Sequence, residues 1–459
     1  MNNKYTWLVA IVLLTAACKV TERYQRPELP AAAQYRDHAG TDTNTIAAKP
    51  WQEFFTDTLL QQLIARGIRE NLDLKMAMQR IVAAQAALKQ SKLAFLPDVN
   101  ANASVKQSRL AFPQGYGLVN NATQYDVGVT ASWEADIWGK LRSSKRAAQA
   151  ALLNTVAAQQ AIQSSLVADI ASTYYTLLAL DQQLLVLQQT LDNRKEDVSS
   201  MRDLKASGVV NGAAVVQSEA NQYAAAVAIP DVKRQIRETE NALSILLALP
   251  PGPVVRSVMS AQQLPQDLST GVPAQLLQYR PDVKAAEYAF RQAFENTNIA
   301  RTAFYPSLSI TAAGGFSSFD FSQWFTNSGL FGNIIGGLTQ PVFNKGLNKA
   351  RLATATARQQ EALYNFSKTM LTAGKEVSDA LYSLASASEK KESREKQLAS
   401  LEKAVDFTKE LLRYSSATNY TDVLTSEQNL LSAQMGGIND QLQQWLAVIA
   451  LYRSLGNGD

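Results

Sequence analysis

The chain has one cysteine and one histidine among 459 residues. Cys18 has no second cysteine with which to form an internal disulfide. His38 alone cannot build a histidine-based zinc site or a catalytic triad, and the sequence has no glycine-rich phosphate-binding loop. We therefore expect no enzymatic activity, no metal site and no cofactor.

Charge and long apolar runs are also scarce. Charged residues make up 18% of the chain, and the net charge of +4 is spread along it, so no nucleic-acid partner is expected. After residue 17 no apolar run reaches the roughly 18 residues that predict a transmembrane helix. A soluble periplasmic protein stays open, and so does a β-barrel, whose strands need only about 10 residues each.

The N-terminus resembles a secretory signal. Lys4 precedes an apolar run over residues 5–17, which ends in LTAAC and is too short to span a bilayer. This ending resembles a bacterial lipobox, although Thr15 stands where that motif usually has Leu, Val or Ile. We expect a signal peptide over residues 1–17, lipidation of Cys18 and, since Lys19 follows, permitted sorting to the outer membrane. The alternative is a cleaved signal followed by an incidental cysteine.

An internal repeat is the main feature that the sequence does contain. AFLPDV at 94–99 recurs as AFYPSL at 303–308 (303 − 94 = 209), and VVQSEAN at 215–221 recurs as VLTSEQN at 423–429 (423 − 215 = 208). Further landmarks recur in the same order at nearly the same offset. The pattern predicts two fused copies of one structural unit, the alternative being unrelated Ala-rich helices that align by chance.

Strand periodicity begins after Pro97 and after Pro306, where a proline ends the preceding helix. Apolar residues then take every second position in the segments 99–105, 125–133 and 308–316. A fourth strand near residues 330–342 is weaker, because its two adjacent isoleucines would face opposite sides. We predict strand hairpins over residues 97–134 and 306–342.

Long helical tracts fill the rest of both repeats, and small residues at helical spacing favour close coiled-coil packing. A water-soluble helical bundle would show the same helices. We place residues 18–57 in an N-terminal lipid-anchored segment and equatorial region, and the two repeats at residues 58–260 and 261–459. The expected helices are 141–206 and 213–249 in the first repeat, and 273–302, 346–414 and 420–455 in the second.

Four strands per chain cannot form an open sheet in lipid, because its edges would leave backbone groups unpaired. Known barrels that span membranes have at least about eight strands, so several chains must share one barrel. The helices leave and return on the same side of each hairpin. We therefore expect long helices below one rim of a shared barrel, enclosing a tube.

The sequence resembles the TolC-type outer-membrane factor family, in its NodT-like lipoprotein branch. The segments that carry the resemblance are RPDVKAAE (280–287), AFYPSLSI (303–310), LTQPVFNKG (338–346) and TDVLTSEQNLL (421–431). The resemblance implies a homotrimer with a 12-stranded β-barrel in the outer membrane, a periplasmic α-helical barrel and a small mixed equatorial domain built partly from residues 250–272. It also implies a passive exit channel that works with a periplasmic adaptor and an inner-membrane pump of the resistance-nodulation-division type.

The resemblance further implies roles for residues at the two helix turns. Asp422 falls at a family position whose carboxylates project into the closed periplasmic end of the channel and narrow it. The alternative is that Asp422 only stabilises the start of its helix, where an acid lies near the positive end of the helix dipole. Tyr414 is expected to tie neighbouring tips, whereas Thr425 stands where some members carry a second acid. Contacts with the adaptor are expected from Gly208, Val209, Asn419 and Tyr420. Ser416 departs from the family's tip glycine in the second turn.

Three other functions stay open: a structural periplasmic lipoprotein without a pore, a periplasmic adaptor, and the exit duct of a type I secretion system. The alternation after the two prolines disfavours the first, which needs no lipid-compatible strands. The twofold repeat disfavours the second. The sequence does not separate drugs, metal ions and metabolites as cargo.

Overall fold

The computed structural model describes residues 20–27, 49–109, 121–265, 279–414 and 419–456. In chain order the elements are α2 (Trp51–Phe54), α3 (Thr58–Glu70), α4 (Leu72–Leu93), β1 (Asp98–Arg109), β2 (Asn121–Ala135), α5 (Lys140–Ala206), α6 (Gly212–Leu246), η2 (Met259–Ala261), α8 (Pro281–Thr302), β3 (Ser307–Ser318), η4 (Phe321–Gln323), η5 (Asn327–Gly329), β4 (Leu330–Thr339), α9 (Leu347–Tyr414) and α10 (Tyr420–Ser454). The expected class, mainly helical with four strands per chain, is confirmed. None of the described helices combines the length and hydropathy needed to cross a bilayer.

The chain divides into two compact units. The sheet unit comprises Met1–Leu29, Arg80–Thr155 and Ala285–Phe366. The helical unit comprises Pro30–Gln79, Val156–Lys284 and Ser367–Asp459. The long helices α4, α5, α8 and α9 contribute residues to both.

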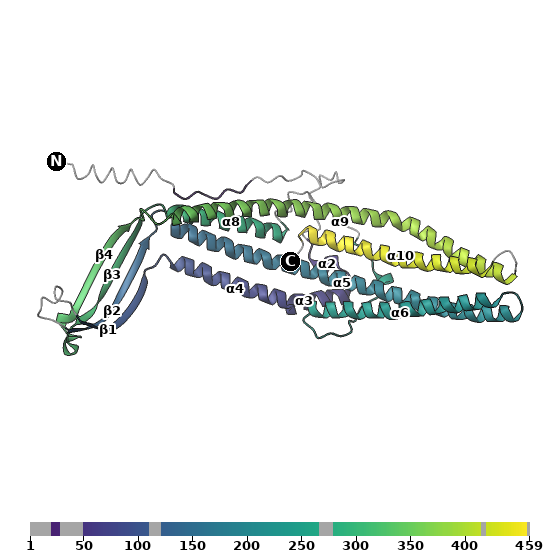
Figure 1. Cartoon of the computed structure of the whole chain (residues 1–459). Coiled ribbons are helices and arrows are strands. Elements are labelled where there is room, and N and C mark those ends of the chain that lie inside the picture. Colours follow the sequence, from purple (N-terminus) through teal and green to yellow (C-terminus); the bar gives the residue numbers. More distant parts are fainter. Residues whose placement is uncertain (1–19, 28–48, 110–120, 266–278, 415–418, 457–459) are drawn as a thin grey trace. The chain divides into compact units, whose positions relative to one another are not determined.

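The sheet unit holds one antiparallel sheet in the order β1-β2-β3-β4 (Figure 1). Cross-strand partners share a face, and the register pairs Val99 with Ala131, Trp133 with Ile310 and Ala312 with Ile334. The face so defined carries Val99, Ala101, Ala103, Val105, Tyr125, Val127, Val129, Ala131, Trp133, Leu308, Ile310, Ala312, Gly314, Phe316, Leu330, Gly332, Ile334, Gly336 and Leu338. We call these residues the apolar face; on the same side of the sheet, polar residues follow them at the Tyr125 end, namely Gln107, Arg109, Asn121, Thr123 and Ser318.

The opposite face of the sheet is mostly polar and includes a close backbone approach. A Cβ on Gly315 would lie 2.1 Å from the carbonyl oxygen of Val127 and 2.5 Å from the Cα of Gly128. The ring of Phe331 lies 3.5 Å from the position that a Cβ on Gly128 would take. Glycine is therefore required where β2 meets β3, and an aromatic ring from β4 covers the gap.

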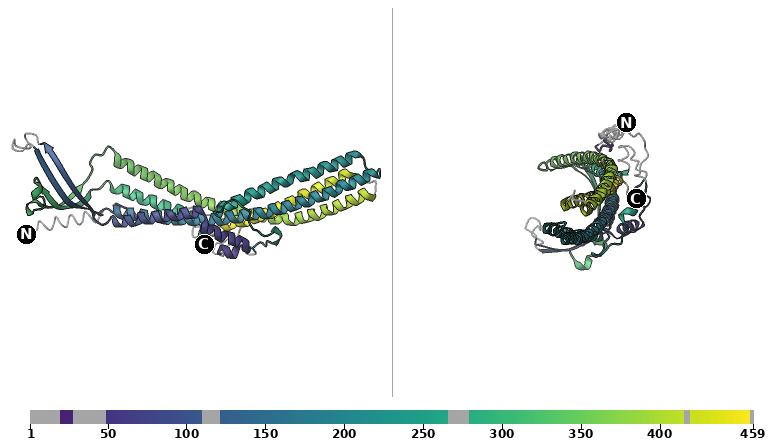
Figure 2. Two further views of the ribbon diagram at one scale, coloured as in Figure 1. Left: turned by 90° about the horizontal axis from the view of Figure 1, so that it is seen from below. Right: turned by 90° about the vertical axis from the view of Figure 1, so that its right-hand side faces the viewer.

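The helical unit contains two helix pairs, α5–α6 and α9–α10, which we call the hairpins; they lie side by side, with the last residues of α5 and α9 and the first residues of α6 and α10 at the same end (Figure 1, Figure 2). In its core the rings of Tyr175 and Trp445 stack with centroids 4.1 Å apart, which joins α5 to α10. Asp57 caps α3 and accepts hydrogen bonds from the hydroxyls of Tyr174 (2.7 Å) and Ser257 (2.5 Å), which fastens the segment after α6 to α5.

The two repeats tie their ends in equivalent ways. The side chain of Asn71 donates to the carbonyl oxygen of Leu246 (2.9 Å), the last residue of α6. The guanidinium of Arg280 donates to the carbonyl oxygen of Ser454 (3.0 Å), the last residue of α10. The offsets are 209 (280 − 71) and 208 (454 − 246), close to those of the sequence landmarks.

The residue that closes each returning helix has a positive φ: Ala248 at 52° and Gly456 at 97°. Glycine adopts this conformation freely, whereas alanine is strained in it. A Cβ on Gly456 would also lie 2.6 Å from the backbone nitrogen of Arg280. The second repeat thus carries the residue that suits the turn, and the first does not.

Candidate functional site

The turn between α5 and α6 closes on a glycine. Gly208 has φ 76°, and the backbone N–H of Val209 donates to the carbonyl of Leu204 (2.8 Å), which ends α5. The side chain of Asn211 then accepts from the backbone N–H of Ala214 (3.1 Å) and starts α6. A Cβ on Gly208 would meet no atom within 4 Å, so the backbone conformation, and not lack of space, calls for glycine.

Helix α10 begins with a capping box. The side chain of Asn419 accepts from the backbone N–H of Asp422, and the carboxylate of Asp422 accepts from the backbone N–H of Asn419, both at 3.2 Å. Asp422 therefore has a local structural role at the positive end of the helix dipole. Both side chains are exposed, so the carboxylate also lies on the surface of the chain.

One turn further on, the hydroxyl of Thr425 donates to the carbonyl oxygen of Thr421 (2.8 Å). The Thr425 side chain is exposed and adds no charge. Asp422 is thus the acid that α10 presents in its first turn.

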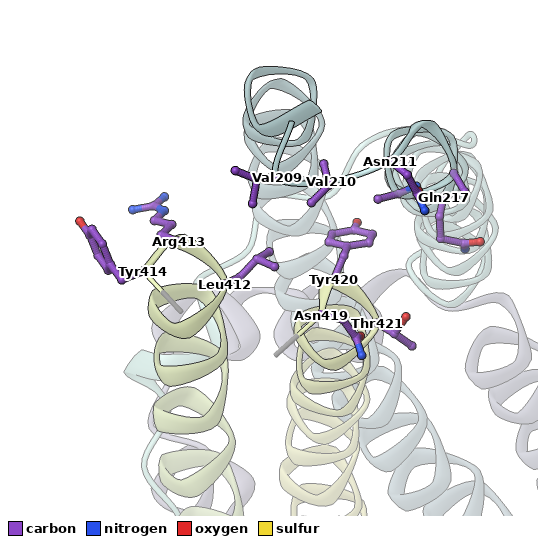
Figure 3. A pocket seen from close by; sticks show the side chains of 12 residues that line it. Val209, Val210, Asn211, Gln217, Leu412, Arg413, Tyr414, Asn419, Tyr420 and Thr421 are labelled. Carbon is purple, nitrogen blue, oxygen red and sulfur yellow. The ribbon is translucent and has the colours of Figure 1, made fainter. Parts of the chain in front are cut away.

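A hydrophobic cluster joins the turn ends of the two hairpins. Its buried members are Met201, Val215, Leu412, Tyr420 and Val423. Tyr420 is only 7% exposed and, as Figure 3 shows, points between the hairpins, which differs from its expected place on the contact surface. The physical reason is that neighbours from α5, α6 and α9 cover the first turn of α10. We call the five buried residues of this hydrophobic cluster the tip cluster.

Two other expected residues lie at the surface of the tip. Tyr414, the last residue of α9, is 82% exposed, and its ring points away from Tyr420 in Figure 3. Val209 is 59% exposed. An aromatic ring and an aliphatic side chain are therefore open to contact with another chain.

Next to the tip cluster, at the end of the hairpins where α6 and α10 begin, lies a hollow of about 760 Å³. Residues of both hairpins line it: Val209, Val210, Asn211, Ala213, Ala214, Gln217, Leu412, Arg413, Tyr414, Asn419, Tyr420 and Thr421 (Figure 3). It brings together residues that the sequence analysis singled out in two turns far apart in the chain. Asp422 and Thr425 lie just beyond it on α10.

Farther along the helices from the tip cluster, four charged side chains form a network of ion pairs that the sequence analysis did not predict. The ammonium of Lys409 lies 2.7 Å from Glu427 Oε1 and 3.1 Å from Asp197 Oδ1, and the guanidinium of Arg194 lies 3.8 Å from Glu427 Oε2. Burial raises the pKa of Glu427, the bond with Lys409 lowers it, and the charge of Asp197 adds to the rise. One sequence signal pointed here, since Glu427 belongs to the repeated motif at 423–429.

Several expected residues lie outside the described ranges. These are Cys18, His38 and Ser416, together with part of the segment 250–272.

The model of a family described as "Outer membrane efflux protein" matches residues 63–249 and 272–457. Three curated relatives are similar over nearly their whole length. The probable outer membrane lipoprotein SilC of Salmonella typhimurium is 27% identical, with 98% of each chain covered. The cation efflux system protein CusC of Escherichia coli is 28% identical, with 98% of each chain covered. The toluene efflux pump outer membrane protein TtgC of Pseudomonas putida is 30% identical over 100% of this chain and 96% of its own.

Solved structures show the same fold. The outer-membrane channel OprN superposes with a TM-score of 0.89 at 25% identity, covering 96% of this chain and 99% of its own. CusC superposes with a TM-score of 0.83 at 29% identity, covering 95% and 99%.

Proposed function

Because the chain belongs to the outer membrane efflux protein family, it is an efflux channel of the outer membrane, and we propose that three copies form one passive duct. In this proposal the duct carries what an inner-membrane pump delivers through a periplasmic adaptor. It performs no catalysis. The observation that carries the proposal is the sheet, which combines a continuous apolar face with two edges that have no partner within the described chain.

The edges of the sheet support a barrel that more than one chain shares. β1 pairs only with β2, and β4 pairs only with β3, among the described strands. An edge in lipid must be paired, and a barrel that spans a membrane has at least about eight strands. Three chains with four strands each give twelve, with β4 of one chain against β1 of the next. A periplasmic spacer without a pore would not need an apolar face of this extent.

Aromatic residues at both ends of the apolar face support its placement in the bilayer. Tyr125 packs against Phe321 and Trp324, with centroids 5.4 Å apart in each case. At the other end, the indole N–H of Trp133 donates to the carbonyl oxygen of Phe95 (2.9 Å). Tyr125 and Trp133 are eight residues apart on β2 (133 − 125 = 8), or about 27 Å at about 3.4 Å per residue. Strands of outer-membrane barrels tilt by about 35–45°, so this length covers about 19–22 Å along the membrane normal, most of the apolar band of about 25 Å between their aromatic girdles.

At the tips we propose two roles. Three copies of Asp422 ring a constriction that favours cations and whose mutual repulsion makes it easy to loosen. The exposed Tyr414 and Val209, with Gly208 and Asn419, form the surface that meets the adaptor. Tyr420 supports that surface from beneath, because it is buried in the tip cluster.

Cargo and pump are proposed only by class. The names of CusC and TtgC refer to different cargoes, cations and toluene. We propose a duct whose cargo is chosen by its pump, with a pump of the resistance-nodulation-division type in preference to a type I secretion system. Lipidation of Cys18 is part of the proposal and is supported by the lipoprotein name of SilC.

The test is single-channel conductance of the purified full-length protein in a planar bilayer, with its mass in detergent. A trimer with small, cation-selective conductance is expected. A monomer that conducts nothing would overturn the duct.

Three variants then separate the gate role of Asp422 from its capping role. Asp422→Asn removes the charge but keeps an oxygen that can accept from the N–H of Asn419, whereas Asn419→Ala removes half of the capping box and keeps the charge. We expect Asp422→Ala and Asp422→Asn to raise conductance and Asn419→Ala to leave it near the wild-type value. A rise in Asn419→Ala equal to that in Asp422→Ala would assign the effect to the lost helix cap and remove the gate.

A further inference from the structure

Two carboxylates from different hairpins converge on one ammonium in the helical unit. Asp197 lies on α5 of the first hairpin and Glu427 on α10 of the second; Lys409, on α9, contacts both. We call Asp197 and Glu427 the acid pair. Their side chains are 15% and 11% exposed, so solvent screens the two negative charges only weakly.

Each acid leaves one oxygen unsatisfied. Asp197 Oδ2 and Glu427 Oε2 are buried and have no hydrogen-bond partner among the described residues. The guanidinium of Arg194, at 3.8 Å from Glu427 Oε2, is an ion-pair partner at a distance too long for a hydrogen bond. A buried acceptor without a donor is costly, and two carboxylates that share a site tend to share a proton.

We propose that the acid pair is a proton-binding site, in which Glu427 takes a proton from solvent and donates a hydrogen bond to Asp197. No bond between heavy atoms changes. The network of Arg194, Lys409, Asp197 and Glu427 goes from a formal charge of zero to one positive charge. The new hydrogen bond links α10 directly to α5, so the proton strengthens the contact between the two hairpins.

The surroundings of Glu427 favour this uptake. The charged groups that face it are Arg194 and Asp197 from α5 and Lys409 from α9. Burial raises the pKa of Glu427, the bond with Lys409 lowers it, and the charge of Asp197 raises it further, so the net result is a raised pKa of Glu427. A group whose pKa is higher in the folded than in the unfolded state contributes most stability at low pH, and this contribution is lost as pH rises through the folded value.

The first repeat provides a natural comparison. Glu219 occupies the equivalent place on α6 (427 − 219 = 208) and pairs with Arg202 of α5 at 2.7 Å. Their side chains are 31% and 64% exposed, and among the described residues no second acid joins this pair. Glu219→Gln is therefore a matched control that removes an acid from the same motif without touching the acid pair.

The site has a consequence for the gate, and this part rests on the proposed function. Glu427 lies five residues after Asp422 on α10 (427 − 422 = 5). A proton on the acid pair holds the start of α10 against α5. Any movement of α10 away from α5 must first break this contact. Acidification of the periplasm therefore favours the closed state of the gate, in which α10 stays against α5.

The test is hydrogen exchange, read by mass spectrometry, on the full-length protein at about pH 5 and about pH 7.5. The readout is an α5 peptide that contains Arg194 and Asp197, whose sequence Glu427→Gln and Glu219→Gln leave unchanged. Each variant is compared with wild type at the same pH, so the intrinsic pH dependence of exchange cancels. In Glu427→Gln the new side chain mimics the protonated acid, because its amide can donate to Asp197.

We expect Glu427→Gln to exchange several-fold more slowly than wild type at the higher pH and at the same rate at the lower pH. Glu219→Gln should match wild type at both. Exchange in Glu427→Gln that equals or exceeds the wild-type rate at the higher pH would overturn the proposal. Should Glu427→Gln fail to fold, Asp197→Asn decides by the same criterion, read on an α10 peptide. Exchange requires neither bilayer nor pump, so a failure of the duct itself would appear only in conductance.

Discussion

The close approach of β2 and β3 makes Gly315→Ala a severe test of the sheet. The added Cβ would lie 2.1 Å from the carbonyl oxygen of Val127 and 2.5 Å from the Cα of Gly128, both far below contact distance. Backbone atoms cannot rotate away as side chains can, so the strands must separate. Overpacking typically costs about 1–3 kcal/mol, and we expect the upper end, about 3 kcal/mol, because ladder hydrogen bonds are lost as well.

The neighbouring residue on the same strand supplies the control. A Cβ on Gly314 would lie 3.6 Å from the carbonyl oxygen of Phe331, an ordinary contact, so Gly314→Ala should be close to neutral. A loss of about 3 kcal/mol lowers the folded-to-unfolded ratio by about a hundredfold. The assay is the fraction of outer-membrane protein that migrates as a heat-modifiable oligomer. Equal fractions for the two variants would refute the close approach of the strands.

Two further predictions concern the helical unit. Ala248→Gly should stabilise the protein by about 0.5–1 kcal/mol, because relief of left-handed strain of about 1–2 kcal/mol exceeds the extra chain entropy of glycine, about 0.5–1 kcal/mol; a thermal midpoint at or below the wild-type value would contradict the positive φ. Tyr420→Ala should cost about 3–5 kcal/mol by opening the tip cluster, whereas Tyr414→Ala, at an exposed site, should change stability by less than about 0.5 kcal/mol. Hydrogen exchange of the residues around the tip cluster is the measurement. If Tyr420→Ala and Tyr414→Ala lost similar protection there, the burial of Tyr420 would be refuted.

The helices and the first three strands could be predicted from the sequence because each shows its own periodicity over many residues. β4 could not be predicted with the same certainty. Its glycines carry no polarity, and the two faces become distinguishable only through the pairing of Ile334 with Ala312 and of Ile335 with Thr311. Register is a property of two strands, so one strand's composition was not enough.

The candidate site shows a similar limit. Gly208 and Asp422 were visible because turns and helix starts have local chemistry. The burial of Tyr420 depends on α5 and α6, which lie far away in the sequence. The acid pair is more remote still, since Asp197 and Glu427 are 230 positions apart (427 − 197 = 230). The motif around Glu427 repeats, but it does not indicate which residue of α5 lies beside Glu427.

The unpaired edges of the sheet also have a genetic consequence. In the proposed trimer each chain offers one edge to each neighbour, so a single damaged edge strand is enough to leave the ring open at one seam. If wild-type and edge-defective chains are made in equal amounts and mix at random, only about one channel in eight is free of a faulty chain. Alleles with damaged edge strands should therefore be dominant, whereas alleles that merely prevent synthesis should be recessive.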